Sequence, residues 1–211
     1  MRLGTIYRTK LFGRLGVSAS GARVLDVGSY DSHWLSLQPG ATRVGVDLDV
    51  APRAGVNAIR GDGLRLPFAD GSFDSVFAFD VIEHVDNPAT FVRELARVTA
   101  PGGTITLSTP NADLRIFPGF LTRWAHRRWG HYGKTGFSPG ELRLFFHEAG
   151  VTSVDARPLR TWTFLKFYLP LSVLTRVVRP MSDRICGAAA LIDSRLLSEG
   201  DRGYVLARVK K

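Results

Sequence analysis

The sequence contains a single cysteine, Cys186, among its 211 residues. An intrachain disulfide is therefore impossible, which suits a reducing compartment. The most apolar stretch, residues 162–178, is interrupted by lysine, proline and arginine, so it falls short of the ~20 apolar residues that a membrane-spanning helix needs. Residues 1–10 lack the apolar core of a signal peptide. We therefore expect a cytoplasmic protein, with peripheral attachment to a membrane left open.

Acidic residues are scarce as well. The 19 Asp and Glu residues face 28 Lys and Arg residues, which gives a formal net charge of +9. Basic side chains gather before Asp26, in residues 115–134 and in residues 157–184. This charge favours anionic partners such as lipid headgroups, phosphorylated substrates or nucleic acid, with an arginine-rich solvated surface as the alternative. The length, without repeats or low-complexity tracts, suits a single domain over residues 1–211.

Short apolar segments that end in turns recur along the chain, as buried parallel strands do. Helical patterns lie between them, and Asn87 and Ser138 are the predicted N-caps. Strands that alternate with helices predict an α/β fold, a Rossmann-like sheet with helices on both faces. The expected strands are residues 23–27, 43–47, 56–60, 75–79, 104–109, 152–157 and 204–209, and the expected helices are residues 88–99 and 138–149.

Two stretches are longer than this alternation needs, namely residues 112–137 and 158–202. If the strands before them run parallel to the others, both stretches leave the sheet at its carboxyl edge, where open α/β sheets bind ligands. We interpret them as insertions that form a lid and shape substrate choice. A peripheral structural elaboration is the alternative.

Aspartates stand at or just after the ends of the first three expected strands. They are Asp26, Asp47 and Asp62. Gly28 follows Asp26 at a position where the backbone must turn tightly, and Asp47 lies about 20 residues further on, the offset at which an acid meets a ribose in dinucleotide folds. Because ribose hydroxyls and the adenine amino group donate hydrogen bonds, these carboxylates predict a ligand that contains adenosine.

Six segments carry a resemblance to a known family. They are residues 24–28 (VLDVG), 44–49 (VGVDLD), 61–74 (GDGLRLPFADGSFD), 79–88 (FDVIEHVDNP), 97–111 and 137–150. Together they resemble the motifs of class I S-adenosylmethionine (SAM)-dependent methyltransferases. The resemblance implies SAM as the methyl donor and a seven-stranded sheet whose last strand is antiparallel. A dehydrogenase would instead need G-x-G-x-x-G after the first strand, which GSYDSH at residues 28–33 does not match.

The resemblance also assigns a donor site by position in these motifs. Asp47 would bind the ribose hydroxyls, Asp62 with Gly63 would face the adenine, and Asp26 would orient the turn or the methionine ammonium. Residues flanking the methionine part or completing the site would be Gly28, Ser29, Tyr30, Leu48 and Phe79. Tyr30 and Ser32 stand where the family has glycine, so the Tyr30 ring must turn away from the donor or crowd it. Weak SAM binding, or a non-catalytic relative, is therefore an alternative.

Three further residues follow the fourth expected strand: Asp80, Glu83 and His84. On one helical turn their spacing would place them on one face. His84 could then act as a general base near neutral pH. Alternatively, all three could hold a divalent cation, since their spacing is similar to the E-x-x-E-H segment of ubiquinone-biosynthesis O-methyltransferases. A purely structural role is the third interpretation.

The methyl acceptor is the least determined part. Residues of the insertions that could line its pocket are His126, His131, Trp124, Trp129, Trp162 and Phe164. Residues 162–179 mix bulky apolar with cationic side chains, as segments at a membrane surface or around a lipid-linked substrate do. We predict a small-molecule acceptor, either free or lipid- or glycan-linked. Neither an RNA-binding module nor an Asn/Asp-Pro-Pro-Tyr/Phe motif is present, so an RNA methyltransferase is the less favoured alternative.

Overall fold

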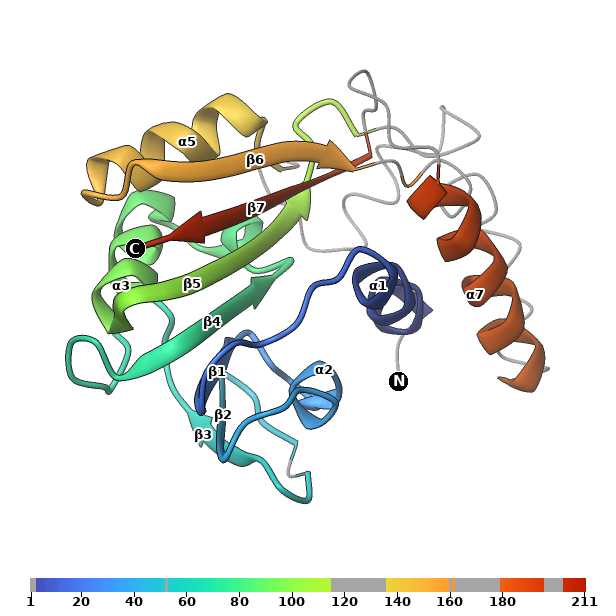
Figure 1. The fold of residues 1–211 in the computed structure, drawn as a ribbon, viewed down its shortest axis with the longest axis horizontal. Helices are drawn as coiled ribbons and strands as arrows, with labels where there is room; N and C mark the ends of the chain where they lie inside the picture. The colour runs from blue at the N-terminus through green and yellow to red at the C-terminus, as the bar shows by residue number, and fades with distance from the viewer. Residues whose placement is uncertain (1–2, 52, 115–135, 160, 162–178, 196–202) are drawn as a thin grey trace.

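The computed structural model describes residues 3–51, 53–114, 136–159, 161, 179–195 and 203–211. Its centre is a seven-stranded sheet with the order β3-β2-β1-β4-β5-β7-β6 (Figure 1). Six strands run parallel, and β7 lies antiparallel between β5 and β6. The predicted α/β fold and its antiparallel last strand are confirmed. The strands are β1 (Arg23–Val27), β2 (Thr42–Asp47), β3 (Asn57–Arg60), β4 (Phe73–Phe79), β5 (Thr99–Pro110), β6 (Ser153–Leu159) and β7 (Tyr204–Lys210).

Helices cover both faces of the sheet, with α3 and α5 on one side and α1, α2 and α7 on the other (Figure 1). The N-caps follow the sequence prediction. Asn87 Oδ1 accepts the Thr90 N–H at 3.0 Å, and Ser138 and Glu141 form a reciprocal capping box. The helices are α1 (Leu3–Arg14), α2 (His33–Ser36), α3 (Pro88–Val98), α5 (Pro139–Glu148), α7 (Arg179–Arg195) and the short 3₁₀ helix η1 (Ile82–His84).

The strand alternation divides the core into two apolar clusters. On β1, Leu25 and Val27 face the cluster under α3 and α5, whereas Val24 faces the cluster under α1, α2 and α7. Asp26 shares the side of Val24, because side chains two positions apart on a strand point to the same face. An acidic residue thus lies at the end of a buried strand, on the face that α1 covers.

Helices α1 and α7 are joined through a buried polar contact. The Tyr7 hydroxyl donates to Asp193 Oδ2 at 2.6 Å, although the two residues lie 186 positions apart. Both side chains are buried. Burial and the neighbouring Asp193 carboxyl raise the pKa of Tyr7, so the phenol keeps its proton and remains a donor.

Replacing Tyr7 by phenylalanine is expected to lower the free energy of unfolding by about 2 kcal/mol, because the buried carboxyl loses a short hydrogen bond. Urea unfolding measures the change. Lys10→Gln on the same helix is the control. Lys10 pairs with Asp183 at 3.1 Å, but Asp183 is 60% exposed, and such pairs contribute about 0.5 kcal/mol or less. A Tyr7→Phe variant as stable as the control would contradict the structural role of this contact.

Candidate cofactor and methyl-transfer site

The predicted acids meet at one edge of the sheet. Strands β1, β2, β3 and β4 are parallel neighbours, so their carboxyl ends lie side by side. Asp26 is in β1 next to its end, Asp47 ends β2, and Asp62 follows β3 by two residues. The sheet topology therefore brings these three acids together, although the first and the last lie 36 positions apart along the chain.

The turn after β1 contains three residues with positive φ angles. Gly28 has φ +78°, and its N–H and that of Ser29 both donate to the Val46 carbonyl, at 2.7 and 3.2 Å. Tyr30 and Ser32 adopt φ angles of 41° and 52°, so they keep the left-handed conformation in which glycine is favoured. The Tyr30 side chain is 44% exposed, so its ring is not enclosed within the core.

Asp47 joins this turn to the end of β2. Its Oδ2 accepts the Tyr30 N–H at 2.8 Å, and its Oδ1 accepts the Asp49 N–H at 3.0 Å. A carboxylate has about four lone-pair positions, so two remain for hydroxyl donors of a ligand. Leu48 follows directly and is 67% exposed. The large apolar side chain of Leu48 is thus exposed to solvent next to Asp47 in the chain.

The loop after β3 is shaped by close packing. Asp62 is exposed, and its Oδ1 accepts the Leu64 N–H at 2.9 Å. A Cβ at Gly63 would come within 2.7 Å of the Phe91 ring on α3. Glycine at this position therefore lets the loop pack directly against the helix and keeps the Asp62 carboxyl at the edge.

Asp26 differs from the other two acids because it is buried. It is 4% exposed, and within the described ranges its carboxyl has no hydrogen-bond partner. Burial raises the pKa of Asp26 to about 7; the Arg8 guanidinium acts in the opposite direction, and Asp47 and Asp31 add to the rise. A cation placed beside this carboxyl would favour its ionised form.

Sequence reasoning missed Arg8. This residue of α1 donates through Nη1 to Asp80 Oδ2 at 2.6 Å, and its guanidinium lies over the Phe79 ring, 5.5 Å from the centroid. Ser108 of β5 donates to the other carboxyl oxygen of Asp80 at 3.1 Å. No local pattern indicates a contact between residues 72 positions apart. Helix α1 thereby supplies a cation to the end of β4.

Asp80, Glu83 and His84 do not share a helical face, contrary to the sequence expectation. Asp80 has φ 56°, a left-handed conformation that breaks the helical path, and η1 begins only at Ile82. Within the part of the chain that the structure describes, no three His, Cys, Asp or Glu side chains are grouped to hold a metal ion. His84 is exposed. Its role as a base and a divalent cation remain predictions.

Glu83 is a half-buried acid of the region. Its Oε2 accepts a hydrogen bond from the Thr109 hydroxyl of β5 at 3.1 Å, while its Oε1 is buried without a partner among the described residues. Burial, followed by the neighbouring Asp80 carboxylate, raises the pKa of Glu83 well above its ordinary value. An unsatisfied buried oxygen is costly, so this atom suits a ligand that donates a hydrogen bond.

Phe79, which was predicted to complete the donor site, has its side chain in the core. The Phe79 ring is 5% exposed and packs against Phe12 and Trp34, with ring centroids 4.8 and 5.5 Å away. Its side chain thus belongs to the core under α1, and its contact with the cofactor stays a prediction. All the residues proposed to line the acceptor pocket lie outside the described residues; they are His126, His131, Trp124, Trp129, Trp162 and Phe164.

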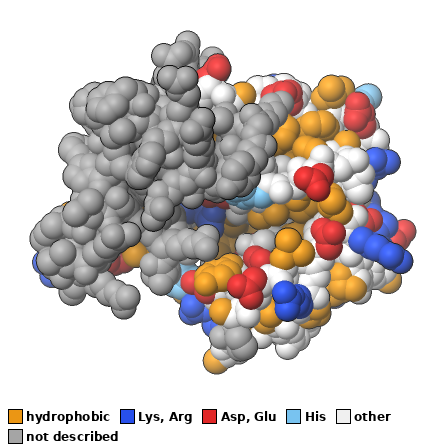
Figure 2. Space-filling view, turned by 180° about the vertical axis from the view of Figure 1, so that it is seen from behind, with side chains coloured by type: hydrophobic (Ala, Val, Ile, Leu, Met, Phe, Trp, Pro, Cys, Tyr) orange, Lys and Arg blue, Asp and Glu red, His pale blue; other side chains and the backbone are white. Residues whose placement is uncertain are grey.

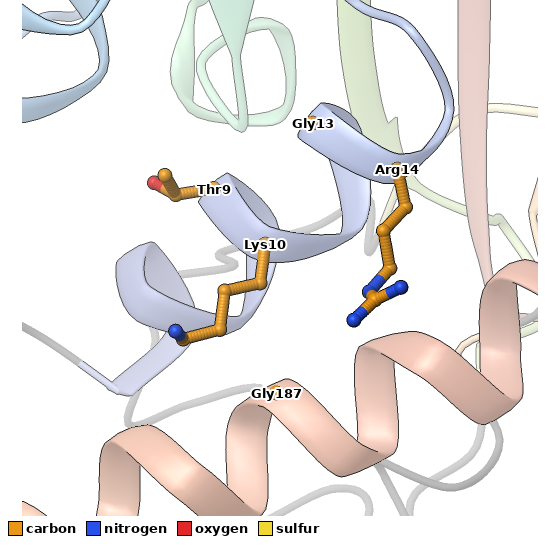
Figure 3. A pocket seen from close by; sticks show the side chains of 5 residues that line it. All are labelled: Thr9, Lys10, Gly13, Arg14 and Gly187. Atoms are coloured by element: carbon orange, nitrogen blue, oxygen red, sulfur yellow. The ribbon is translucent and has the colours of Figure 1, made fainter.

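A separate hollow of about 350 Å³ lies between α1 and α7. It is lined by Thr9, Lys10, Gly13, Arg14 and Gly187 (Figure 3). Lys10 and Arg14 extend toward α7, whereas Arg8 of the same helix bonds to Asp80 at the sheet. The hollow is therefore separate from the sheet edge at which Asp26, Asp47 and Asp62 lie.

Gly28→Ala is expected to destabilise the protein by about 2 kcal/mol, because φ is positive and the new Cβ would collide with Val81 Cγ2. Thermal or urea unfolding measures this loss. Gly16→Ala is the matched control, since Gly16 has φ +66° but nothing within 4 Å of the added Cβ. Equal losses of stability in the two variants would show that the contact with Val81 does not contribute to the destabilisation.

Comparison with known proteins identifies relatives of this chain. Residues 25–107 match a family described as a methyltransferase domain. A probable S-adenosylmethionine-dependent methyltransferase from Mycolicibacterium smegmatis is 34% identical over 165 residues, which cover 70% of this chain and 64% of that protein. The chain spans less than two thirds of the length of the curated relatives it matches.

Solved structures share the fold at low sequence identity. A possible histamine N-methyltransferase from Thermotoga maritima has a TM-score of 0.66 and 18% identity, with 97% of this chain and 89% of that chain covered. Phosphoethanolamine N-methyltransferase 2 from Haemonchus contortus, in complex with phosphomonomethylethanolamine and S-adenosylhomocysteine, has a TM-score of 0.64 and 16% identity over 95% of this chain and 52% of that one. Residues 25–107 of this chain thus match a methyltransferase domain, and the sheet order, the motifs and the sequence relatives are those of class I SAM-dependent methyltransferases.

Proposed function

We propose that this chain transfers the methyl group of SAM to a small-molecule acceptor. The observation that carries the proposal is the row of Asp26, Asp47 and Asp62 along adjacent strand ends. Carboxylates suit both parts of the donor, because adenosine offers hydroxyl and amino donors and the methionine part carries positive charge. The buried Asp26 carboxyl without a described partner and the exposed Leu48 fit a site that a ligand completes.

In this proposal each residue at the carboxyl ends of the strands contacts a different part of SAM. Asp47 binds the ribose hydroxyls, Leu48 packs on the adenine, and Asp62 beside Gly63 accepts from the adenine amino group. The turn at residues 28–30 follows the methionine part, whose ammonium lies near Asp26. Bound SAM supplies a methyl group that its sulfonium has already activated. The protein then has to align the acceptor and keep water out.

Several classes of acceptor are compatible with this role. Two structural neighbours are named as N-methyltransferases of small amines, which supports a small acceptor here. The prediction of a lipid- or glycan-linked acceptor depends on residues 162–178, which lie outside the described residues. None of the helices in the described ranges is both long and apolar enough to cross a bilayer. Attachment to an anionic membrane surface stays a proposal.

Nucleic acid is the less favoured acceptor. On the described part of the face in Figure 2, positive and negative side chains are interspersed, without a continuous basic stripe. Nucleic-acid sites usually concentrate Lys and Arg on one face. Binding to RNA that weakens steeply with added salt would support this alternative instead.

Calorimetry with SAM and with S-adenosylhomocysteine is the first test, and we expect both to bind. Labelled SAM is then offered with amine, quinone, saccharide, lipid and RNA fractions, with and without chelator. Label in a small-molecule or lipid fraction supports the proposal. Binding without turnover of any fraction indicates a non-catalytic binding module, and the lack of heat with both ligands refutes the proposal. Loss of activity with chelator would make Asp80, Glu83 and His84 metal ligands, whereas unchanged activity would remove that role.

A further inference from the structure

Glu83 and Thr109 form a polar pair at the adjoining ends of β4 and β5. These strands are parallel, and Phe79 pairs with Ser108 in their register. Thr109 is fully buried, and its hydroxyl holds one carboxyl oxygen of Glu83 at 3.1 Å. The other oxygen, Oε1, is buried and has no described partner. The pair thus fixes the carboxyl in place and leaves one strong hydrogen-bond acceptor unused.

The position of this pair favours the acceptor over the methyl donor. The acids proposed for the donor come from β3, β2 and β1, in that order across the sheet. Strands β4 and β5 are the next two in the same direction. Because in-line transfer needs the nucleophile beyond the methyl group, the acceptor belongs over β4 and β5. Among the described residues there, Glu83 offers a buried carboxyl oxygen without a partner.

The charges around Glu83 favour a nitrogen acceptor. Asp80 is close enough to raise the pKa of Glu83, so a group bound beside Glu83 would interact with both carboxyls. Arg8 is the cation that acts on Glu83, but its Nη1 already bonds to Asp80 at 2.6 Å. Among the described residues, Asp80 and Glu83 thus share one cation. A positive group placed beside Glu83 would favour the ionised form of its carboxyl and be attracted by it, whereas an anionic acceptor would be repelled.

We propose that Glu83 is an acceptor-binding residue and that the acceptor is an amine whose N–H donates a hydrogen bond to Oε1. This inference rests on the proposed methyl transfer. The amine reacts in its neutral form, and an acceptor that arrives as an ammonium first releases a proton to solvent. During transfer the nitrogen lone pair forms the bond to the methyl carbon, and the carbon–sulfur bond breaks with its electron pair left on sulfur. Positive charge thereby moves from sulfur to nitrogen, beside the carboxyl of Glu83, which stabilises it as it develops.

Binding of matched fragments tests the inference without turnover. The protein is saturated with S-adenosylhomocysteine in EDTA and titrated with 2-phenylethylamine, 2-phenylethanol and 3-phenylpropanoate, and with isopentylamine and isopentanol. We expect each amine to bind about 10-fold or more tightly than its alcohol, because a charge-assisted hydrogen bond is gained, and the carboxylate to bind least. Equal affinity of amine and alcohol in the wild-type protein overturns the inference.

Substitutions assign the preference to Glu83. In Glu83→Gln the amine-to-alcohol ratio should fall to within about threefold, and in Glu148→Gln, an exposed glutamate on α5, it should stay at the wild-type value. A Glu83→Gln variant that keeps the ratio overturns the inference. A Glu83→Gln variant that loses affinity for SAM but not for S-adenosylhomocysteine also overturns the inference, because Glu83 would then face the sulfonium. Failure of S-adenosylhomocysteine to bind refutes the proposed function itself, and its binding without an amine preference refutes only this inference.

Discussion

Replacing Asp47 by asparagine is expected to weaken SAM binding by about 30- to 100-fold. The change keeps the size of the side chain but removes the charge from the acceptor proposed for the ribose hydroxyls, and hydrogen bonds to charged groups contribute about 1.5–3 kcal/mol. The carboxylate also holds the N–H groups of Tyr30 and Asp49, so part of the loss would come through the turn after β1. Calorimetric titration with SAM and with S-adenosylhomocysteine measures the effect.

Asp49→Asn provides the matched control for this experiment. Asp49 lies two residues further along the same loop and is exposed, and its side chain has no proposed contact with the donor. We expect its affinity for SAM to change by about twofold or less. Similar affinities in the Asp47 and Asp49 variants would contradict the assignment of the ribose site to the end of β2.

Asp26→Asn is expected to become more stable relative to the wild type as the pH rises from 5 to 8. The pKa of Asp26 is about 7 in the folded protein, against 3.8 as its ordinary value. Between these values the folded state binds more protons than the unfolded state, so the contribution of Asp26 to stability is lost as the pH rises through 7. A shift of about 3 pKa units corresponds to up to about 4 kcal/mol, and asparagine does not titrate.

Urea unfolding of both proteins at pH 5, 6, 7 and 8 measures this difference, in which the titration of all other groups cancels. Asp86→Asn changes an exposed residue, and its stability difference should stay constant over the same range. Excess SAM should reduce the pH dependence for Asp26, because the proposed ammonium favours the ionised carboxyl. A difference for Asp26→Asn that does not vary with pH would mean that the carboxyl is hydrated in the folded state.

Helix α1 links the end of β4 to helix α7. Its Arg8 bonds to Asp80 at the end of β4, and its Tyr7 bonds to Asp193 of α7. Helix α7 lies within the second insertion, residues 158–202, that was interpreted as a lid. The described part of that insertion is thus packed against α1 and not separate from the domain. The roles of the undescribed parts of both insertions stay predictions.

Local patterns predicted the strands, the helices α3 and α5, and the strand ends at which the acids lie, whereas α1, α2 and α7 were not predicted. Apolar runs gave the strands, and Asn87 and Ser138 began their helices as predicted, because caps and strand burial depend on neighbouring residues. Aspartates at successive strand ends had to meet once the strands were parallel. The position of Gly28 likewise followed from the sequence, since its turn needs a positive φ.

The surroundings of the predicted catalytic residues depended on the tertiary structure. The sequence spacing of Asp80, Glu83 and His84 suggested one helical face, but the left-handed backbone at Asp80 prevents it. Arg8 reaches Asp80 across 72 positions, and Thr109 reaches Glu83 across 26. Such contacts form only when helices and strands pack together, and no periodicity of the chain encodes them. The sequence by itself determined at which strand ends the acids lie, because local patterns set the strands. Only the packing of α1, β4 and β5 decided which carboxyl oxygens remain unpaired among the described residues.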